Sequence, residues 1–306
     1  MIKTGHHRLF EVVATAVCVV LLVPAMAQAS WNAGNFYKYG IGSRPFGMGD
    51  AFAAVADDAT AVYWNPAGLV NVPPGQFFVS YANRFGLELQ EQSAGATFRI
   101  QEKHFFGVAV VRAGLGDIKK STSRDGNNRP IVDGTFDNSQ INLTVSTAMR
   151  VHDLLSFGLS GKYYGEALDG NSAHGFGFDV GWLFHPRQNL SLGFNGQNLN
   201  RPRMKWDTGT GHYDRIPANL KLGGSALFFS SQLLVTADLN APDFERVLLN
   251  SGAEYQLMSN LRMRAGFSGD QPGAGMSINV GHLRIDYGYR SHDLGDTHRI
   301  SLIATI

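Results

Sequence analysis

Short segments with alternating apolar and polar residues follow one another along most of the chain. In residues 283–290, Leu, Ile and two Tyr residues alternate with Arg, Asp, Gly and Arg. The same period of two recurs in residues 140–150, 190–195 and 261–268. Because successive side chains of a strand point to opposite faces, each segment predicts a strand with one apolar and one polar face.

Fourteen such strands are predicted between residue 76 and the end of the sequence. Their predicted ranges are 76–83, 93–100, 104–112, 139–149, 154–164, 175–185, 189–198, 217–228, 232–239, 246–256, 260–268, 273–281, 282–290 and 297–306. The connections after even-numbered strands are short, whereas those after odd-numbered strands include polar loops over residues 113–138, 165–174 and 199–216. An even strand number with this alternation of connections is typical of outer-membrane barrels. We therefore expect an all-β fold, a transmembrane antiparallel β-barrel of about 14 strands, over residues 76–306.

A soluble β-sandwich or β-propeller also alternates strands with turns. Here nearly every strand carries one apolar face of similar height, as a lipid-facing belt requires. After residue 29 no stretch approaches the roughly 18 to 20 apolar residues of a membrane-spanning helix, so a membrane protein of this sequence is expected to be a closed barrel. The alternation directs Leu192, Val145 and Ile285 toward lipid, and Ser191, Thr144 and Arg284 toward the lumen.

Residues 1–29 have the features of an export signal. Lys3 and Arg8 precede an apolar run over residues 12–23, and small residues at 25–29 offer a cleavage site. We expect the mature chain to begin between Gln28 and Ser30. The only cysteine, Cys18, is interpreted as an apolar core residue of the signal, which leaves the mature protein without disulfide or thiol chemistry.

The charge of the mature chain is balanced. Cleavage removes two of the 26 basic and one of the 25 acidic residues, which leaves 24 of each. This balance gives no indication of a nucleic-acid partner. Together with the export signal and the predicted barrel, it is consistent with the outer membrane of a Gram-negative bacterium.

Residues 30–75 lack the alternation and contain many small residues. We expect Asp50 to cap a short helix that runs to about Asp57, and residues 65–68, Asn-Pro-Ala-Gly, to form a turn. A fourteen-strand barrel is wide enough to leave a lumen. The Ala and Gly side chains suit close packing against a wall, so we expect this segment to lie inside the lumen as a plug. A periplasmic tail or a small lid is the alternative.

The run over residues 44–69, RPFGMGDAFAAVADDATAVYWNPAGL, resembles the N-terminal signature of the PorV/PorQ group of outer-membrane proteins, relatives of the FadL-like (OMPP1/FadL/TodX) barrels. Residues 252–255, 261–266 and 286–302 are similar to the same group. The resemblance implies a fourteen-strand barrel with an N-terminal plug. It assigns the plug motif to Pro45, Gly47, Met48, Gly49, Asp50, Asp57, Asn65, Pro66 and Gly68. The sequence departs from the usual barrel ending, because Ile306 stands where an aromatic residue is usual, and this weakens recognition by the outer-membrane barrel assembly machinery.

The resemblance implies two kinds of function. FadL-like members pass hydrophobic molecules through the outer membrane, whereas PorV-like members collect secreted cargo at the cell surface for type IX secretion. A channel requires an apolar pocket beside the plug and a break in a wall strand, whereas a shuttle requires shaped outer loops. The modest predicted loops favour a channel for hydrophobic, fatty-acid-like small molecules, with a PorV-like secretion or surface-attachment component as the alternative. The expected partners are outer-membrane lipid, the barrel assembly machinery, and either a hydrophobic ligand or secreted protein cargo.

Charged residues on the inward faces are the most specific local signal. They form a permeation path, a docking surface for the plug, or a salt-bridged wall that fills a wide barrel. The plug residues Asp50, Asp57 and Asp58 could balance an excess of basic residues, so we infer no anion selectivity. The predicted lumen-facing residues are Lys162, Asp179, Lys221, Asp238, Asn250, Glu254, Arg262, Arg264, Arg284, Asp286, Arg290 and Arg299.

An enzyme is a weaker interpretation. Ser160 lies in a Gly-Leu-Ser-Gly run, and several histidines are available, which invites comparison with an outer-membrane phospholipase. A serine nucleophile is activated at a strand-to-helix turn, whereas Ser160 is predicted in mid-strand. The histidines lack the close pairing of a metal site. We therefore expect no catalytic residue, no metal and no cofactor.

Overall fold

The computed structural model describes residues 40–306 except 87–88, 210 and 245. The predicted export signal, the predicted start of the mature chain and residues 30–39 of the predicted plug lie outside the described residues.

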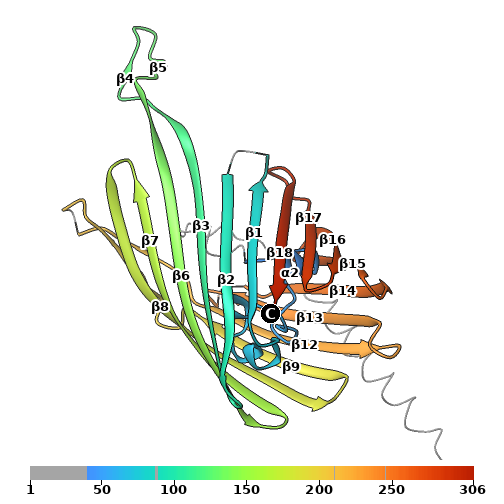
Figure 1. The fold of residues 1–306 in the computed structure, drawn as a ribbon. Coiled ribbons are helices and arrows are strands. Elements are labelled where there is room, and N and C mark those ends of the chain that lie inside the picture. Colours follow the sequence, from blue (N-terminus) through green and yellow to red (C-terminus); the bar gives the residue numbers. More distant parts are fainter. Residues whose placement is uncertain (1–39, 87–88, 210, 245) are drawn as a thin grey trace, which may run out of the picture.

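Fourteen antiparallel strands close into a barrel, as the alternation predicts (Figure 1). The ring closes because the last strand pairs with the first over residues 76–83 and 298–305. A closed ring leaves no sheet edge and distinguishes the fold from a β-sandwich or a propeller. The strands of the ring are β1(Gln76–Arg84), β2(Leu89–Gln101), β3(His104–Lys120), β6(Gly134–His152), β7(Leu155–Leu168), β8(Asn171–Arg187), β9(Leu190–Gln197), β12(Asn219–Phe228), β13(Leu233–Pro242), β14(Leu248–Met258), β15(Leu261–Ser268), β16(Gln271–Val280), β17(Leu283–Arg290) and β18(Thr297–Thr305).

Short elements complete the described chain. The hairpin β4(Ser123–Arg124) and β5(Pro130–Ile131) projects at the far end of β3 and β6, and β10(Arg203–Trp206) and β11(Tyr213–Arg215) extend the wall beside β8. Before β1 lie α2(Ser43–Gly47), α3(Ala61–Trp64) and the 3₁₀ helix η2(Pro66–Asn71). No helix among the described residues is both long and apolar enough to cross a membrane.

Exposure alternates along the strands as the sequence pattern requires. The outward residues Val145, Leu192 and Ile285 are 51%, 46% and 49% exposed. Thr144, next to Val145, is 1% exposed because it faces the filled interior. The outer surface is therefore an apolar belt, and the inner surface is polar and largely covered.

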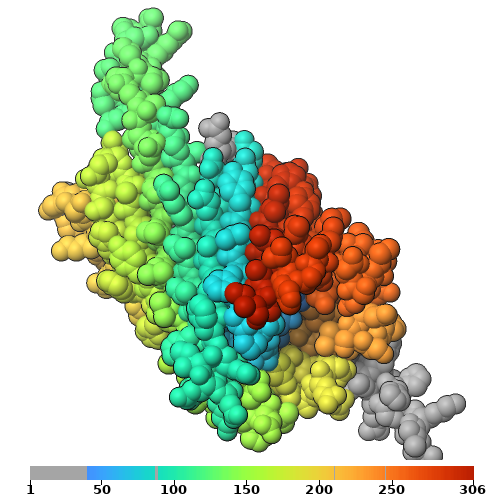
Figure 2. All heavy atoms as spheres, in the orientation of Figure 1, coloured from blue at the N-terminus to red at the C-terminus, as the bar shows by residue number. Residues whose placement is uncertain are grey.

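Two predicted outer loops are strands instead. β3 runs to Lys120 and β6 begins at Gly134, so most of residues 113–138 belongs to strands. Residues 165–174 contain only a two-residue turn, between Leu168 and Asn171. Beyond the lipid-facing belt neither face of a strand has to be apolar, so the strands continue without the alternation that would reveal them. The result is a tall half-wall of β3, β6, β7 and β8 that rises above the shorter strands on the other side (Figures 1 and 2). We call this end of the barrel the long-loop end and the opposite end the short-turn end.

The predicted helix from Asp50 to Asp57 is wrong. Asp50 has a φ of 61°, a left-handed conformation that cannot begin a helix, and the residues after it form turns. Its carboxylate accepts a hydrogen bond from Arg290 of the wall, which replaces the expected cap. The predicted turn at residues 65–68 is instead the start of η2, where the Asn65 side chain caps the helix by accepting from the Ala67 N–H.

We expect Val145→Arg to destabilise the barrel by on the order of 2 to 4 kcal/mol, because Val145 lies midway along the apolar belt. The matched control is Ser139→Arg on the same strand, six residues nearer the long-loop end, which should cost much less. Urea unfolding of the protein in lipid vesicles measures both. Equal costs would show that the belt is placed wrongly. Thr144, the inward neighbour of Val145, is not a suitable control, because an arginine there would meet the packed interior.

Candidate functional site

The interior of the barrel is occupied by the N-terminal segment, which we define as residues 40–72. Its apolar residues form most of the main hydrophobic cluster, in which Ile41, Met48, Phe52 and Trp64 are at most 1% exposed. Phe52 and Trp64 pack edge to face with ring centroids 6.2 Å apart. Phe105, Val111 and Ile303 of the wall belong to the same cluster. The segment therefore packs against the inner surface of the barrel.

Inward-facing glycines of the wall allow this close approach. A Cβ atom at Gly252 of β14 would lie 2.5 Å from the carbonyl oxygen of Met48, and one at Gly193 of β9 would lie 2.1 Å from that of Ala53. No side chain fits at those distances. Glycines in strand interiors commonly mark such a close backbone approach. Gly158, Gly181 and Gly266 meet the segment in the same way.

Arg44 is the centre of a buried ion-pair network. It is 4% exposed, and its guanidinium donates to Glu254 of β14, with Nε 3.0 Å from Oε2, and also to Asp57. Glu254 also lies 3.3 Å from Arg264 of β15. A buried guanidinium without a carboxylate costs several kcal/mol, so these pairs hold the segment to the wall.

Asp58 extends the network to β17. Its carboxylate accepts from Arg284 at 2.6 Å, and Arg284 in turn donates to Asp286 at 3.0 Å. Burial alone would raise the pKa of the Asp58 carboxyl, but the charges of Arg284 and Arg44 and a hydrogen bond from Thr60 lower it to about 2. Asp58 therefore stays ionised, and its ion pairs persist, until the pH falls toward that value.

Two further arginines hold helix α2. Arg290 and Arg299 both lie over the Phe46 ring, with guanidinium carbons 4.1 Å and 4.7 Å from its centroid. Arg290 donates to Asp50 at 2.6 Å, and Arg299 donates to Glu91 of β2 at 2.8 Å. Arg299 also donates to the carbonyl oxygens of residues 40 and 42.

The remaining predicted lumen residues lie on the other side of the segment or near its edge. Lys162 pairs with Asp179 at 2.5 Å, and Lys221 lies 4.2 Å from the centroid of the Trp64 ring. The Asp238 carboxylate accepts from the backbone N–H groups of residues 52 and 53. Asn250 is buried and accepts from the Gly269 N–H, whereas Arg262 is partly exposed at the cavity described below.

Strands β6 to β9 contact the segment mainly through hydrogen bonds to backbone carbonyl oxygens. Asn195 donates to the carbonyl oxygen of Trp64 at 2.7 Å, and Gln197 donates to that of Tyr63 at 2.9 Å. The Asn65 side chain donates to the carbonyl oxygen of Trp182 in the wall. The segment is thus held by ion pairs to β14 and β17, and by hydrogen bonds to carbonyl oxygens on β6 to β9, where Arg150 also donates to the Val70 carbonyl oxygen.

The residues of the predicted plug motif all lie in this segment. Pro45 and Gly47 belong to α2, Met48 and Gly49 lie against β14 and β15, and Asp57 is the partly exposed member at 43% of its side chain. Pro66 begins η2, and Gly68 packs where a Cβ would lie 2.1 Å from the carbonyl oxygen of Ala56. That this segment closes a transport path stays a prediction.

Ser160 lies in mid-strand on β7 and shares a hydrogen bond of 2.8 Å with Ser146. Ser146 in turn donates to the carbonyl oxygen of Val62 in the segment. The serine thus contributes to packing between wall and segment. Among the residues that the structure describes, no group of three or more His, Cys, Asp or Glu side chains is placed to hold a metal ion.

The wall is irregular beside β8, at residues 198–202. β9 pairs with β8 up to Gly196, opposite Val180, and β10 resumes the pairing at Lys205, opposite His174. The stretch from Gly196 to Lys205 is therefore three residues longer than the stretch of β8 that it faces, from His174 to Val180. Asn198 and Arg201 take left-handed conformations with φ of 51° and 47°. We call residues 198–202 the strand break.

Side chains from the inner face stabilise the strand break. The Tyr164 hydroxyl of β7 donates to the side-chain oxygen of Asn198 at 2.6 Å. The N–H of Asn198 donates to Asp179, the partner of Lys162. Tyr164 also belongs to a second buried apolar cluster with Ala173, Met204, Trp206 and Ile216.

A small pocket lies between the N-terminal segment and strands β2, β3, β6 and β7. Its volume is about 20 Å³, room for roughly one water molecule. It adjoins the break through Tyr164, which lines the pocket and binds Asn198. The lining residues are Gly40, Ile41, Tyr63, Glu91, Val111, Asn142 and Tyr164.

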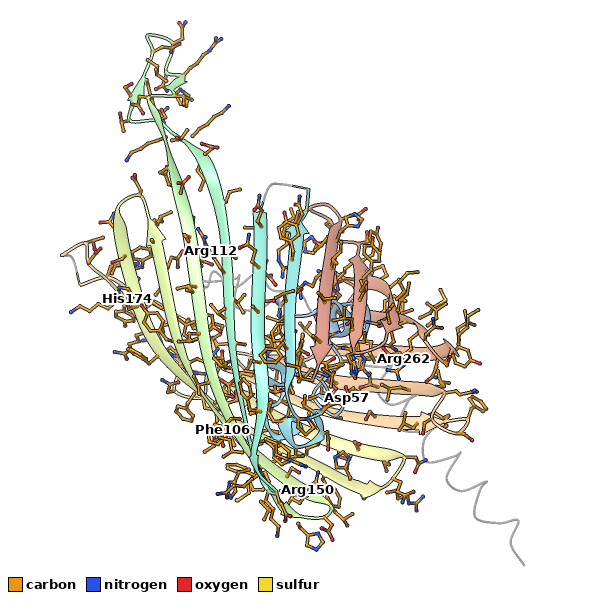
Figure 3. The ribbon with its side chains drawn as sticks, viewed as in Figure 1. Asp57, Phe106, Arg112, Arg150, His174 and Arg262 are labelled. Atoms are coloured by element: carbon orange, nitrogen blue, oxygen red, sulfur yellow. The ribbon has the colours of Figure 1, made fainter. Side chains whose placement is uncertain are left out.

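A larger cavity of about 370 Å³ opens at the short-turn end. Asp57 and Arg262, both labelled in Figure 3, line it together with Arg44 and Glu254. His185, Gln188, Asn189 and Ser191 contribute further polar groups. This cavity is therefore polar and carries several charged groups, whereas Glu91 is the one charged residue among the described residues that line the small pocket.

The sequence pattern did not identify several residues of this site. Arg44, Phe46, Tyr63, Glu91 and Tyr164 carry contacts that depend on chain positions far apart, such as Arg44 with Glu254. One usable signal was present, because inward-facing glycines in successive strands indicate a close neighbour. The strand break had no comparable signal apart from the Asn-rich run at residues 195–200.

The fold and the interior define a class of β-barrel in which an N-terminal segment lies inside fourteen strands. No protein-family model and no curated protein matches the chain. Several solved structures, however, match the chain. The Ralstonia pickettii toluene transporter TbuX aligns with a TM-score of 0.63 and 17% identity over 88% of this chain and 98% of that chain.

Two other structures are similar to a comparable degree. The Pseudomonas putida toluene transporter TodX aligns with a TM-score of 0.61 and 14% identity over 87% of this chain and 96% of that chain. A Pseudomonas aeruginosa FadL homologue aligns with a TM-score of 0.60 and 15% identity over 86% of this chain and 97% of that chain. The chain therefore has the fold of the FadL/TodX-type barrels. The PorV/PorQ resemblance stays a prediction.

We expect Glu254→Gln to destabilise the barrel by about 3 to 5 kcal/mol, because it leaves Arg44 and Arg264 buried without their shared carboxylate. The matched control is Asp57→Asn, which removes another partner of Arg44 at a partly exposed position and should cost less than about 1 kcal/mol. Urea unfolding in vesicles measures both changes. Equal and small costs would show that the network does not hold the segment.

Proposed function

We propose that this protein is an outer-membrane channel of the FadL-like superfamily that passes hydrophobic small molecules. The observation that carries the proposal is the strand break beside the small pocket. A channel of this kind requires a pocket next to an internal plug and a place where the wall can open. The strand break is an irregularity of the wall at which Leu199 and Asn200 still hydrogen-bond to β8, and Tyr164 connects it to the pocket. TbuX and TodX, which have the same fold, are toluene transporters.

The apolar belt supports a position in a membrane. Outward residues such as Val145 and Ile285 are half exposed, and a surface of this kind is stable only against hydrocarbon. Aromatic pairs such as Tyr163 with His174 and Tyr287 with His298 lie toward the long-loop end of the same outer face. Aromatic girdles of this type mark the membrane interface in outer-membrane barrels.

The proposed path enters at the long-loop end and leaves sideways. A hydrophobic molecule would have to widen the small pocket, would contact Ile41, Val111 and Tyr164 there, and would then pass the strand break into the lipid. The cavity at the short-turn end is lined by Arg44, Asp57 and Glu254, so desolvating those groups would oppose passage of a hydrocarbon there. The N-terminal segment acts in this proposal as the plug that closes the direct route.

The pocket favours a neutral hydrocarbon over a fatty acid. Its one charged lining residue is Glu91, which is paired with Arg84 and Arg299. A carboxylate ligand would be repelled by Glu91 and would find no free cation among the described lining residues. We therefore propose aromatic or aliphatic hydrocarbons as the first substrates to test, with a long-chain fatty acid as the comparison.

One observation favours the alternative secretion role. The tall half-wall ends in the β4–β5 hairpin, where Ile131 and Val132 are 45% and 55% exposed, and this gives the long-loop end a shaped projection that a cargo protein could contact (Figure 2). Deletion of residues 121–133 separates the two roles. A channel should keep its uptake, whereas a secretion component should lose display of its cargo.

We expect Tyr164→Ala to raise the uptake of radiolabelled toluene several-fold, because it enlarges the pocket and removes the hydrogen bond to Asn198. The matched control is Tyr163→Ala, since the adjacent side chain points outward. Uptake is measured in a Gram-negative host that lacks its own hydrocarbon channels, with leakage of a hydrophilic sugar as a check on barrel integrity. If both variants transport like the original protein, the path does not pass Tyr164.

Deletion of residues 43–69 should leave the barrel assembled but open a wide pore. The strands pair with one another, and the exposed inner charges would be hydrated in a water-filled lumen. Planar-bilayer conductance should rise well above that of the intact protein. An unchanged conductance would contradict the role of the segment as a plug, and in that case exchange of Asn65 or Pro66 should also leave uptake unaffected.

A further inference from the structure

A group of basic side chains lies on the outward face of the β10–β11 hairpin. Arg203 and Lys205 of β10 and Arg215 of β11 are exposed, whereas the intervening Met204 and Ile216 are buried on the inner face. Arg203 and Arg215 are directly opposite in the register of the two strands. We define Arg203, Lys205 and Arg215 as the cationic patch.

The cations of the patch have no carboxylate partner among the described residues. Neighbouring charges in the same region are paired, because Arg201 lies 3.4 Å from Asp243 and His212 lies 3.3 Å from Asp214. The carboxylate of Asp207 accepts hydrogen bonds from Ser172. The acidic groups nearby are thus already engaged, and the patch remains positively charged.

Tyr213 contacts both arginines of the patch. The guanidinium carbons of Arg203 and Arg215 lie 5.0 Å and 5.6 Å from its ring centroid, and Arg215 donates to the phenol oxygen at 3.2 Å. The Arg215 hydrogen bond and the charges of Arg215 and Arg203 lower the pKa of the Tyr213 phenol. Both guanidiniums therefore lie against the same ring and still have donors for a ligand.

The patch lies at the edge of the apolar belt. Lys205 is directly opposite His174 of β8 in the register, and His174 accepts or donates a hydrogen bond of 2.6 Å with the outward Tyr163. Phe176, two residues toward the belt, is 70% exposed. Arg112 and His174 both lie on the tall half-wall, farther toward the long-loop end than Phe106 (Figure 3). Tyr and His side chains at such an edge lie at the depth of lipid headgroups.

We propose that the cationic patch binds the phosphate groups of an outer-leaflet lipid headgroup. Guanidiniums bind phosphate through paired N–H donors, and a lysine adds a further positive charge. A lipid is the fitting source of phosphate because the patch faces outward from the barrel at headgroup depth, directly above the exposed aromatic residues of β8. This inference uses the placement in an outer membrane from the proposed function, and it is independent of what the channel transports.

The binding of diphosphoryl lipid A to the purified full-length protein in detergent tests the proposal. The variant R203Q/K205Q/R215Q should bind at least roughly tenfold more weakly, because each cation near an anionic headgroup contributes about a fivefold factor. The matched control is K119Q/R124Q/R129Q, which removes the same charge from β3 and the β4–β5 hairpin. It should bind within about twofold of the original protein.

Heat-modifiable gel mobility verifies that each variant is folded, and K205Q alone replaces the triple variant if that protein does not fold. Equal binding by the patch variant, or an equal loss in the control, would overturn the proposal. Full displacement of lipid A by inorganic phosphate would show a site for free anions instead of a headgroup site. Lipid binding and toluene uptake are separate measurements, so failure of either proposal can be told from failure of the other.

Discussion

Buried charge is the constraint on which this structure depends. The inward faces of β7, β12, β15, β17 and β18 carry lysines and arginines inside a closed barrel, where an unpaired guanidinium costs several kcal/mol. Carboxylates of the wall pair with some of these cations. In the N-terminal segment, Asp50 pairs with Arg290 and Asp58 pairs with Arg284. The segment in turn brings Arg44, which needs Glu254 of the wall. Wall and segment are therefore electrostatically complementary, and neither is satisfied alone.

The distribution of these contacts is uneven around the barrel. Ion pairs hold the segment to β14 and β17, whereas β18 and β6 to β9 hold it through hydrogen bonds to backbone carbonyls, as from Arg299, Asn195 and Gln197. The strand break lies beside β8, and the small pocket is lined by the segment and by β2, β3, β6 and β7, so neither includes a residue of the network around Arg44. A rearrangement near Tyr164 and Asn198 would disturb a different buried ion pair, because Asn198 donates to Asp179, the partner of Lys162.

The strands were predictable because lipid imposes an apolar face at every second position, as in the segment around Val145. The inward direction of Arg264, Arg284 and Asp286 followed from the same period. Their partners did not follow, since Arg44 and Glu254 are separated by 210 positions. The tall parts of β3 and β6 were missed because no lipid requires alternation there. The helix expected after Asp50 was wrong because a tertiary contact to Arg290 decides the conformation of Asp50, and local preference does not.

The contacts of the N-terminal segment also fix an order of assembly. Ser43 hydrogen bonds to Ser301, 258 positions later in the sequence, and Arg299 donates to the backbone of residues 40 and 42. The part of the chain that is synthesised earliest among the described residues therefore finds its partners only when the last strand is present. Closing so long a loop carries a large entropic cost that the ion pairs offset only at the end. Insertion of β18 beside β1 would then seal the ring and capture the segment in one late, cooperative step, so a chain truncated before β17 would lack both the closing pair and the seat of its own N-terminus.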